Sequence, residues 1–294
     1  MTAIEERVPL ARMTTIGIGG PARWFARPAS VEELQQALGW AAEHGVEAIP
    51  IGLGSNVLVH DDGLDALVVR LTGALTAVEV DGDLLIAGGG AANAVCVHRA
   101  RDAGLGGFEF ASAIPGTAGG GVRMNAGAYA RDWNDVVVDA LVVDAEGART
   151  LAREELELGY RRSALRPGEV VARVRYRLTP RPREEAKALA AQLLAQRKAT
   201  QPTTKRTFGS VFTNPPGEHG AGRLIEEVGL KGHRVGGARI SPVHANFVEN
   251  TGGATSVDAL ALMAEARRRV HERFGIVLEH EVRLLGPLEL PPVV

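Results

Sequence analysis

The chain has 294 residues, of which 45% are hydrophobic, and its 33 Lys and Arg side chains nearly balance 35 Asp and Glu. A chain of this length can bury a sizeable core and is predicted to form two or three structural units. The near-zero net charge gives no general field that would attract nucleic acid or an anionic membrane. We therefore expect neither as a partner, and any bound anion must be held by a local site.

The first residues are polar and acidic and carry no basic segment followed by an apolar one, so we expect no secretory signal and a cytoplasmic location. No uncharged apolar run reaches membrane-spanning length. The single cysteine, Cys96, excludes an internal disulfide, and its apolar helical surroundings favour a small buried side chain over a nucleophile. The histidines show no metal-ligand spacing paired with cysteine, so we predict no metal site.

The first predicted unit covers residues 1–75 and opens with a β-α-β pattern: a strand over 22–27, a helix from the capping sequence Ser30-Val-Glu-Glu33 to about His44, and a strand over 46–51. Gly52-Leu-Gly-Ser-Asn56 follows the second strand, at the strand end where α/β sheets usually bind ligands. A strand-like Val57-Leu-Val59 comes next instead of the helix that a dinucleotide-binding turn requires. This loop alone is therefore weak evidence for a nucleotide-binding site.

The second predicted unit covers residues 76–180. Its pattern indicates a hairpin turning at Asp81-Gly82, a helix over 91–103 that ends at Gly104, and strands over 136–143 and 170–178. In the last of these strands three arginines alternate with apolar residues, which is typical of a half-exposed strand with a solvated face: Arg173, Arg175 and Arg177.

Glycines and small residues crowd the segment 111–129, which is too polar for a core strand and too regular for a linker. Glycine lets backbone N–H groups approach a ligand without a Cβ in the way, so the segment is suited to a large, anionic, planar cofactor. A loop that only needs tight turns is the alternative, and density of glycine alone does not separate the two.

The third predicted unit covers residues 181–294 and begins after Pro180-Arg-Pro182. Periodicity predicts helices over 183–199, 223–228 and 256–274, short strands near Arg239 and Phe247, and a last strand over 282–285.

Six separated motifs occur in one order: Thr14-Thr-Ile-Gly-Ile-Gly-Gly20, Gly52-Leu-Gly-Ser-Asn56, the run from Ile114 to Gly127, Tyr160-Arg-Arg-Ser163, Gly209-Ser-Val-Phe-Thr-Asn-Pro215 and Glu279-His-Glu-Val-Arg283. Together, over about residues 9 to 286, they closely resemble the UDP-N-acetylenolpyruvoylglucosamine reductase (MurB) family. The resemblance implies an α+β fold of the vanillyl-alcohol-oxidase (PCMH) type, with two α+β FAD-binding subdomains. An α+β substrate-binding C-terminal domain follows, whose last strand returns to the active site.

The activity that the resemblance implies is reduction, with NADPH and non-covalent FAD, of the enolpyruvyl group of a UDP-sugar to UDP-N-acetylmuramate. This reaction belongs to peptidoglycan precursor synthesis, and thus to cell wall biogenesis, cell shape and cell division. We expect a monomer whose partner is this small molecule. Only about fifty residues separate Tyr160 from Ser210, without an extra tyrosine-bearing loop, so the chain looks like the shorter type II branch.

Reducing an enolpyruvyl group puts negative charge on carbon and on the adjacent carboxylate, so the site needs fixed cations and an acid close to the carbon. The family motifs place enolate stabilisation on Arg161, proton donation on Ser210 and assistance at the enol oxygen on Glu281. Glu279, two residues earlier, is an alternative candidate for assistance at the enol oxygen. Without the family match, Arg161 resembles a surface arginine and Ser210 an ordinary turn residue.

The resemblance also assigns binding residues. Those for the cofactor are Gly52, Leu53, Gly54, Ser55, Asn56, Ile114, Gly116, Thr117, Gly120, Gly121, Asn125 and Gly127. Those for the substrate are Tyr160, Asn214, His244, Asn246 and Arg283. Between residues 203 and 207, Lys205 or Arg206 is a candidate contact for a diphosphate.

Two other functions fit parts of the pattern. An oxidase of the same fold would use oxygen, but many such enzymes bind flavin through a histidine in the phosphate loop, and residues 52–56 contain none. A catalytically inactive nucleotide-binding module would explain the glycines. It would not require Arg161, Ser210 and Glu281 together.

Overall fold

The structure is a computed structural model that describes residues 3–293. These residues form two compact units that alternate along the chain. Unit 1 contains the start of the chain as far as Arg7 and residues 24–53 and 65–196, and unit 2 contains residues 8–23, 54–64 and the chain from 197 onward. The three-domain division at 75 and 180 stays a prediction.

The first sheet has the strand order β1-β2-β5-β3, formed by Ile4–Pro9, Pro21–Ala26, Leu64–Val69 and Ala48–Pro50. β3 and β5 are parallel, with Ala48 opposite Leu67. Helix α1 (Val31–Glu43) begins where the Ser30 side chain accepts a hydrogen bond from the Glu33 N–H, at 3.2 Å, which satisfies an otherwise free helix donor. The predicted β-α-β opening is confirmed.

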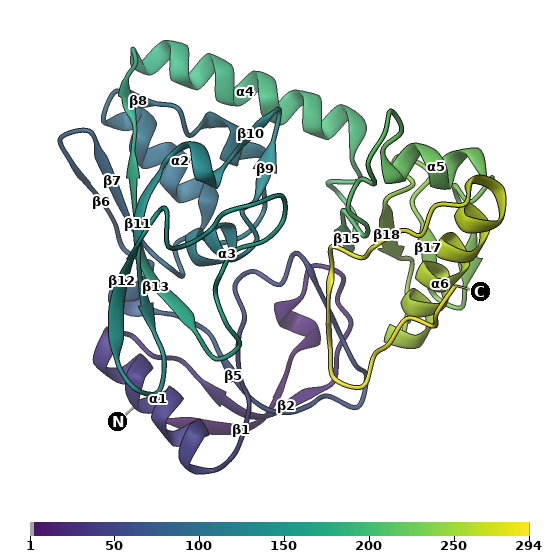
Figure 1. Cartoon of the computed structure of the whole chain (residues 1–294), viewed down its shortest axis with the longest axis horizontal. Helices are drawn as coiled ribbons and strands as arrows, with labels where there is room; N and C mark the ends of the chain where they lie inside the picture. Colours follow the sequence, from purple (N-terminus) through teal and green to yellow (C-terminus); the bar gives the residue numbers. More distant parts are fainter. Residues whose placement is uncertain (1–2, 294) are drawn as a thin grey trace. The chain divides into compact units, whose positions relative to one another are not determined.

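Unit 1 also contains an antiparallel sheet of order β12-β11-β13-β7-β6, formed by Ala148–Ala152, Val137–Val143, Val170–Arg177, Leu84–Gly88 and Val78–Asp81. Asp81 pairs with Leu84, so the predicted hairpin is confirmed. Helices α2 (Asn93–Asp102) and α3 (Ala118–Arg123) contact this sheet (Figure 1). The alternation in β13 is also confirmed, because Arg175 forms an ion pair with Asp139 beside buried Val174 and Tyr176.

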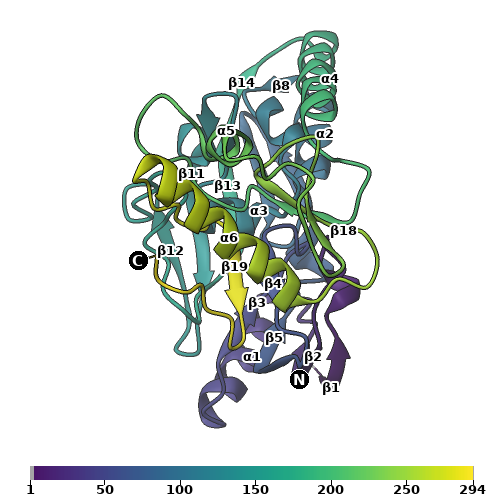
Figure 2. The same ribbon diagram turned by 90° about the vertical axis from the view of Figure 1, so that its right-hand side faces the viewer.

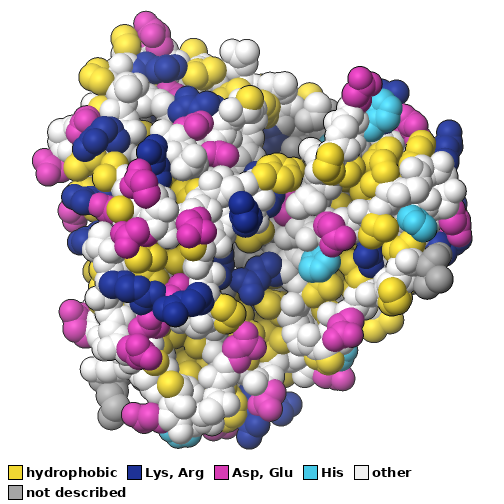
Figure 3. All heavy atoms as spheres, in the orientation of Figure 1, with side chains coloured by type: hydrophobic (Ala, Val, Ile, Leu, Met, Phe, Trp, Pro, Cys, Tyr) yellow, Lys and Arg dark blue, Asp and Glu magenta, His cyan; other side chains and the backbone are white. Residues whose placement is uncertain are grey.

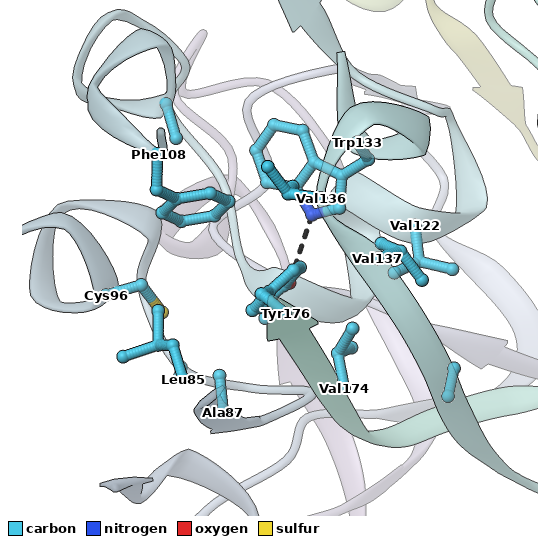
Figure 4. Packing of buried hydrophobic residues seen from close by; sticks show 14 of the residues in the cluster. Leu85, Ala87, Cys96, Phe108, Val122, Trp133, Val136, Val137, Val174 and Tyr176 are labelled. Atoms are coloured by element: carbon cyan, nitrogen blue, oxygen red, sulfur yellow. Dashed lines mark hydrogen bonds between the residues drawn. The ribbon is translucent and has the colours of Figure 1, made fainter. Parts of the chain in front are cut away.

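An aromatic cluster fills the core between this sheet and its helices. Phe108, Trp133 and Tyr176 are almost fully buried, and the Trp133 Nε1–H donates to the Tyr176 hydroxyl at 3.0 Å (Figure 4). The hydrogen bond lets two polar groups enter an apolar core without losing a partner. Cys96 is buried beside them, and burial raises the pKa of its thiol to about 12, so the prediction of a structural cysteine is confirmed.

Unit 2 is built on an antiparallel sheet of order β15-β18-β17-β16, formed by Thr207–Gly209, Phe247–Asn250, Ala238–Ile240 and Arg234–Val235. Helices α5 (Ala221–Glu227) and α6 (Ser256–Phe274) pack against each other, and α6 also contacts β16 and β17 (Figure 1). Thr255 and Asp258 form a capping box that starts α6, and Gly275, with φ +69°, ends it. The predicted helices and strands of this region are confirmed.

Unit 2 also contains a separate two-stranded sheet. β4 (Val57–Val59) and β19 (Arg283–Leu285) are parallel, with Arg283 opposite Val57, and Figure 2 shows β19 in yellow beside β4. The remaining elements are the long helix α4 (Arg183–Thr200), the short strands β8 (Leu105–Gly106), β14 (Thr179–Pro180), β9 (Gly127–Ala128) and β10 (Arg131–Asp132), and four 3-10 turns at Ala11–Met13, Gly73–Thr76, Glu109–Ala113 and Trp133–Asp135.

The surface carries both signs of charge in mixture, as Figure 3 shows for one face. This agrees with the nearly balanced composition. Within residues 3–293, no helix is long and apolar enough to cross a membrane.

Candidate active site

A cavity of about 380 Å³ lies within unit 1, in the size range of small-molecule sites. Its wall includes backbone from several glycines, together with the polar residues Arg70, Thr117, Arg123 and Glu169. Of the predicted cofactor-binding residues, it contains Gly52, Leu53, Thr117 and Gly120. Glycine-lined walls expose backbone amides, which suits a flat ring or phosphate oxygens.

The glycine-rich segment is more regular than the sequence predicts, because a six-residue helix, α3, lies inside it. The Thr117 side chain accepts the Gly120 N–H at 3.3 Å and so starts this helix. On α3, Gly120 lines the cavity, whereas a Cβ on Gly121 would lie 2.3 Å from the buried indole of Trp133. Gly121 is therefore required by packing, and its predicted contact with the cofactor stays a prediction.

The residues just before α3 are held by Asn93, at the start of α2. Its backbone N–H donates to the Gly116 carbonyl at 3.0 Å and its Nδ2 to the Ile114 carbonyl at 3.1 Å. The Oδ1 atom of Asn93 is buried and accepts no hydrogen bond from any described residue. Asn93 thus fixes the path of two predicted cofactor-binding residues, neither of which lines the cavity.

Two further charged residues of the cavity wall are Arg123, the last residue of α3, and Glu169. The Arg123 guanidinium donates to the carbonyls of Leu165, Arg166 and Glu169, the last at 2.6 Å. Burial alone would raise the pKa of Glu169, but hydrogen bonds from Arg166 and Arg149 outweigh burial and lower it. Glu169 is therefore an ionised carboxylate held in an arginine cluster beside the cavity.

Asn125 ties the end of the glycine-rich segment to the turn that carries Arg161. It is buried, and its Nδ2 donates to the Gly159 carbonyl at 2.9 Å and to the Asp132 carboxylate at 3.1 Å. Gly159 and Arg162 exchange backbone hydrogen bonds across this turn, so Tyr160 and Arg161 form its tip. The amide of Asn125 is thus engaged by the protein itself, and its predicted contact with the cofactor stays a prediction.

Arg161 is held in an uncommon conformation over the same backbone. Its φ is +55°, in the left-handed region that residues with a Cβ seldom adopt. Its Nη2 donates to the Gly127 carbonyl at 3.0 Å, and its guanidinium lies 5.0 Å from the centre of the exposed Tyr160 ring. Strained residues of this kind cluster at functional sites, which favours a functional role for Arg161.

In unit 2, the end of the Gly52–Asn56 loop joins the C-terminal strand. Gly54 has φ +64°, and a Cβ there would lie 2.0 Å from the Met13 carbonyl oxygen, so only glycine fits. The Asn56 Nδ2 donates to the Glu281 carbonyl at 3.1 Å, and the Arg283 N–H donates to the Asn56 carbonyl at 3.0 Å. A predicted cofactor-binding residue thus contacts the backbone of a predicted catalytic one.

Ser210 lies next to the same strand. The Val211 carbonyl accepts the Glu281 N–H at 2.8 Å, and the Thr213 N–H donates to the Glu279 carbonyl at 2.9 Å. Two of the three predicted catalytic residues, Ser210 and Glu281, therefore belong to neighbouring stretches of one unit. Arg161 belongs to unit 1.

The C-terminal glutamates share a surface pocket of about 570 Å³ whose lining includes Glu279, Glu281 and Arg283. Glu281 is half-buried and Glu279 is exposed. The structure thus brings together both candidates for the assisting carboxylate and the predicted substrate-binding arginine.

The other predicted substrate-binding residues of unit 2 differ in whether their side chains bond to the protein or line a pocket. Asn246 is buried with both amide atoms bonded to Phe212, and Asn214 accepts the first N–H of α5, from Ala221, at 3.0 Å. His244 lines a pocket of about 430 Å³ that also contains Arg223, Glu226, Glu227 and Lys231. Burial, and then the neighbouring Lys231, lower the pKa of His244. Its Nδ1 accepts the Asn246 N–H at 3.2 Å, which leaves the proton of the neutral ring on Nε2.

Sequence reasoning missed several residues of the unit 1 cavity, above all Arg70, Thr72, Gly89 and Gly90. Arg70 follows directly on β5 (Leu64–Val69), whose last four residues, 66–69, are apolar and were open to recognition as part of a buried strand. The end of such a strand is where a ligand-binding cation is expected. Within the described part of the chain, no group of three or more His, Cys, Asp or Glu side chains is placed to hold a metal ion.

The comparisons with known proteins first identify the fold. Residues 22–151 match the family model described as FAD binding domain. A solvent-stable cholesterol oxidase aligns over 61% of this chain and 38% of its own at a TM-score of 0.50 and 17% identity, which supports the fold alone. The chain therefore has the FAD-binding fold of the vanillyl-alcohol-oxidase (PCMH) type, joined to a second α+β part.

Residues 201–285 match the family model for the C-terminal domain of UDP-N-acetylenolpyruvoylglucosamine reductase. A protein of that name from Anaeromyxobacter dehalogenans strain 2CP-C is 50% identical over 97% of this chain and 85% of its own, and one from Rubrobacter xylanophilus is 44% identical over 95% and 94%. The crystal structure of the Thermus caldophilus reductase (MurB) covers 97% of this chain and 100% of its own, with 38% identity and a TM-score of 0.85. The chain belongs to the UDP-N-acetylenolpyruvoylglucosamine reductase family.

Proposed function

We propose that this protein reduces the enolpyruvyl group of a UDP-N-acetylglucosamine enolpyruvyl ether to UDP-N-acetylmuramate, with NADPH as the electron donor and FAD as the cofactor. Bound FAD would supply the hydride chemistry that links NADPH to the alkene. The observation that carries the proposal is the backbone pairing of Val211 with Glu281, since it joins the proton-donor loop to the strand of the assisting carboxylate.

The cavity of unit 1 fits part of an FAD molecule. Gly120 has open space where a side chain would stand, because a Cβ at this position would meet only the Thr117 hydroxyl among the described residues, at 3.5 Å. Backbone amides of the glycine wall would hold the cofactor, and Arg70 would add a positive charge for its phosphates. These contacts are non-covalent. Gly52, Leu53 and Thr117 complete the wall.

Hydride addition to one alkene carbon leaves an electron pair that spreads into the neighbouring carboxylate, and a proton must then reach the other carbon. We assign charge stabilisation to Arg161, whose planar guanidinium offers several donors and stays charged. We assign the proton to Ser210 and assistance at the enol oxygen to Glu281. Tyr160, Asn214, His244 and Arg283 are proposed to bind the sugar nucleotide.

Several finer points belong to the same proposal. The chain between Tyr160 and Ser210 forms β13, β14, α4 and β15, which agrees with the short type II branch. We also propose a monomer, and a location in the cytoplasm, because sugar nucleotides carrying UDP are small water-soluble substrates.

The decisive experiment follows the flavin absorbance of the purified protein without oxygen. NADPH should bleach the flavin, and the enolpyruvyl sugar nucleotide should restore the yellow colour. In Ser210→Ala, bleaching by NADPH should survive and restoration should be lost. If substrate fails to restore the colour and admitted oxygen restores it rapidly, the protein is an oxidase, and failure to bleach would indicate an inactive binding module. Fast restoration by substrate in Ser210→Ala would exclude Ser210 as the acid.

A further inference from the structure

Asn246 lies in the segment that leads into β18 and is 2% exposed. Its Oδ1 accepts the Phe212 N–H at 2.9 Å, and its Nδ2 donates to the Phe212 carbonyl at 2.8 Å. Its own backbone carbonyl accepts the Val211 N–H at 2.9 Å. One buried side chain therefore satisfies both backbone polar groups of a single residue, two positions after Ser210.

The stretch from Val211 to Thr213 behaves as a short strand with two different neighbours. On one side, Val211 and Thr213 bond to the chain around Glu281, and Phe212 forms an isolated bridge with His280. On the other side, the amide of Asn246 takes the place of a strand by pairing with Phe212. Thr213 bonds toward Glu279 and Phe212 toward Asn246, as alternate residues of a strand do, whereas Val211 bonds to both neighbours, through its carbonyl to Glu281 and through its N–H to the Asn246 carbonyl. The stretch is therefore hydrogen-bonded on both sides.

We propose that Asn246 is a positioning residue that holds Ser210 in register with Glu281. The inference rests on the proposed function, in which Ser210 supplies the proton. It differs from the direct substrate contact that the family motif suggests, because the buried amide is engaged by Phe212. A serine is a weak acid, so its proton transfer depends strongly on distance and alignment, and a displacement of about 1 Å can slow a reaction by about 100-fold.

Two variants test this role. Asn246→Asp keeps the acceptor for the Phe212 N–H and loses the donor to the Phe212 carbonyl, and Asn246→Ala loses both. Asn250→Ala is the matched control, since Asn250 also bonds to backbone in unit 2, through its Nδ2 to the Ile16 carbonyl at 3.1 Å. The Oδ1 atom of Asn250 accepts from the backbone of Gly252 and Ala254, so its side chain supports a region other than Val211 to Thr213.

In anaerobic stopped-flow measurements, we expect bleaching of the flavin by NADPH to be unchanged in Asn246→Asp. Restoration by saturating substrate should slow by about 10- to 100-fold with a larger solvent deuterium isotope effect. The substrate Kd, read from the perturbed flavin spectrum, should stay within about threefold, as expected when a group acts on the chemical step and not on binding. A higher Kd with a normal restoration rate would instead establish direct substrate contact and overturn the proposal.

A double variant keeps the proposal falsifiable. If Asn246 acts through Ser210, then adding Asn246→Asp should not lower the slow residual rate of restoration that Ser210→Ala shows over hours, whereas a further loss of that rate would refute it.

Hydrogen exchange tests the positioning itself, independently of activity. The amides of Phe212 and Glu281 should exchange faster in Asn246→Ala, which loses both side-chain bonds to Phe212, than in wild type and Asn250→Ala. Unchanged protection would overturn the inference even in an active enzyme. If wild-type flavin is not restored by substrate, the proposed function fails, and exchange still decides whether Asn246 holds the stretch.

Discussion

Two adjacent glycines of α3 should respond in opposite ways to the same substitution. In Gly121→Ala the new methyl would lie 2.3 to 2.6 Å from three atoms of the Trp133 indole. Carbon atoms in contact are ordinarily about 3.5–4.0 Å apart. Trp133 is fully buried and donates to Tyr176, so the indole must move within a packed core or the helix must shift.

The size of this effect follows from the structure. Forcing a methyl into a packed core costs about 1–3 kcal/mol. Weakening the Trp133 to Tyr176 hydrogen bond adds about 1–3 kcal/mol, because both groups are buried. The gain in helix propensity from glycine to alanine returns at most about 1 kcal/mol. We expect Gly121→Ala to destabilise the apoprotein by about 3 kcal/mol.

Gly120→Ala is the matched comparison. Only the Thr117 hydroxyl, among the described residues, lies near its Cβ, at 3.5 Å, which is ordinary contact. We expect the apoprotein to gain about 0.4–1 kcal/mol, because alanine restricts the unfolded chain. The methyl would project where FAD is proposed to lie, so FAD affinity should fall by about tenfold, or about 1.4 kcal/mol.

Urea unfolding of both apoproteins and FAD titration provide the two measurements, and the apoprotein is used because bound cofactor would itself shift stability. If the two variants change stability in the same direction by similar amounts, the packing argument for Gly121 is wrong. If Gly120→Ala binds FAD normally, the assignment of this cavity to the cofactor is wrong.

Three further predictions follow. Cys96 should resist thiol reagents at pH 8 in the folded protein and react after unfolding, because burial raises its pKa to about 12. Arg239→Met should destabilise the protein by about 3 kcal/mol in urea unfolding, since it leaves the buried Glu249 carboxylate unpaired, and Glu249→Leu in the same chain should recover most of the loss. Burial and Lys231 lower the pKa of His244 from 6.5, so the folded state takes up this proton at lower pH than the unfolded chain. Stability should therefore fall as pH decreases below about 6.5, and His244→Gln should flatten that decline in urea midpoints at pH 7.5 and 5.5. An equal decline in the variant would contradict it.

Local patterns predicted the regular elements well, because their signals lie within a few residues. The capping residues Ser30 and Thr255 and the helix-ending Gly275 are used as the sequence indicates. The hairpin at Asp81-Gly82 is likewise a local feature. The helix α3 was missed because three consecutive glycines oppose helix formation, and its Thr117 cap and tertiary packing outweigh that preference.

The site was harder to predict, since motifs identify residues and not their partners. The family resemblance assigns both Asn125 and Asn246 to ligand binding, yet their amides bond to backbone at Gly159 and Phe212, far along the chain. No spacing rule reveals such pairs. The left-handed conformation of Arg161 is equally invisible in sequence, because residues with a Cβ rarely adopt it.

The parallel pairing of β4 with β19 bears on how the protein is made. Val57 emerges from the ribosome long before its partner Arg283 is synthesised, because most of the chain lies between the two residues. Pairing over such a separation requires closure of a very long loop, which makes folding slow. Asn56, adjacent to β4, also depends on Arg283 and Glu281 for its hydrogen bonds. The segment after Gly54 therefore reaches its final arrangement only after Arg283 has been synthesised, and until then the nascent chain carries an unpaired strand edge exposed to aggregation.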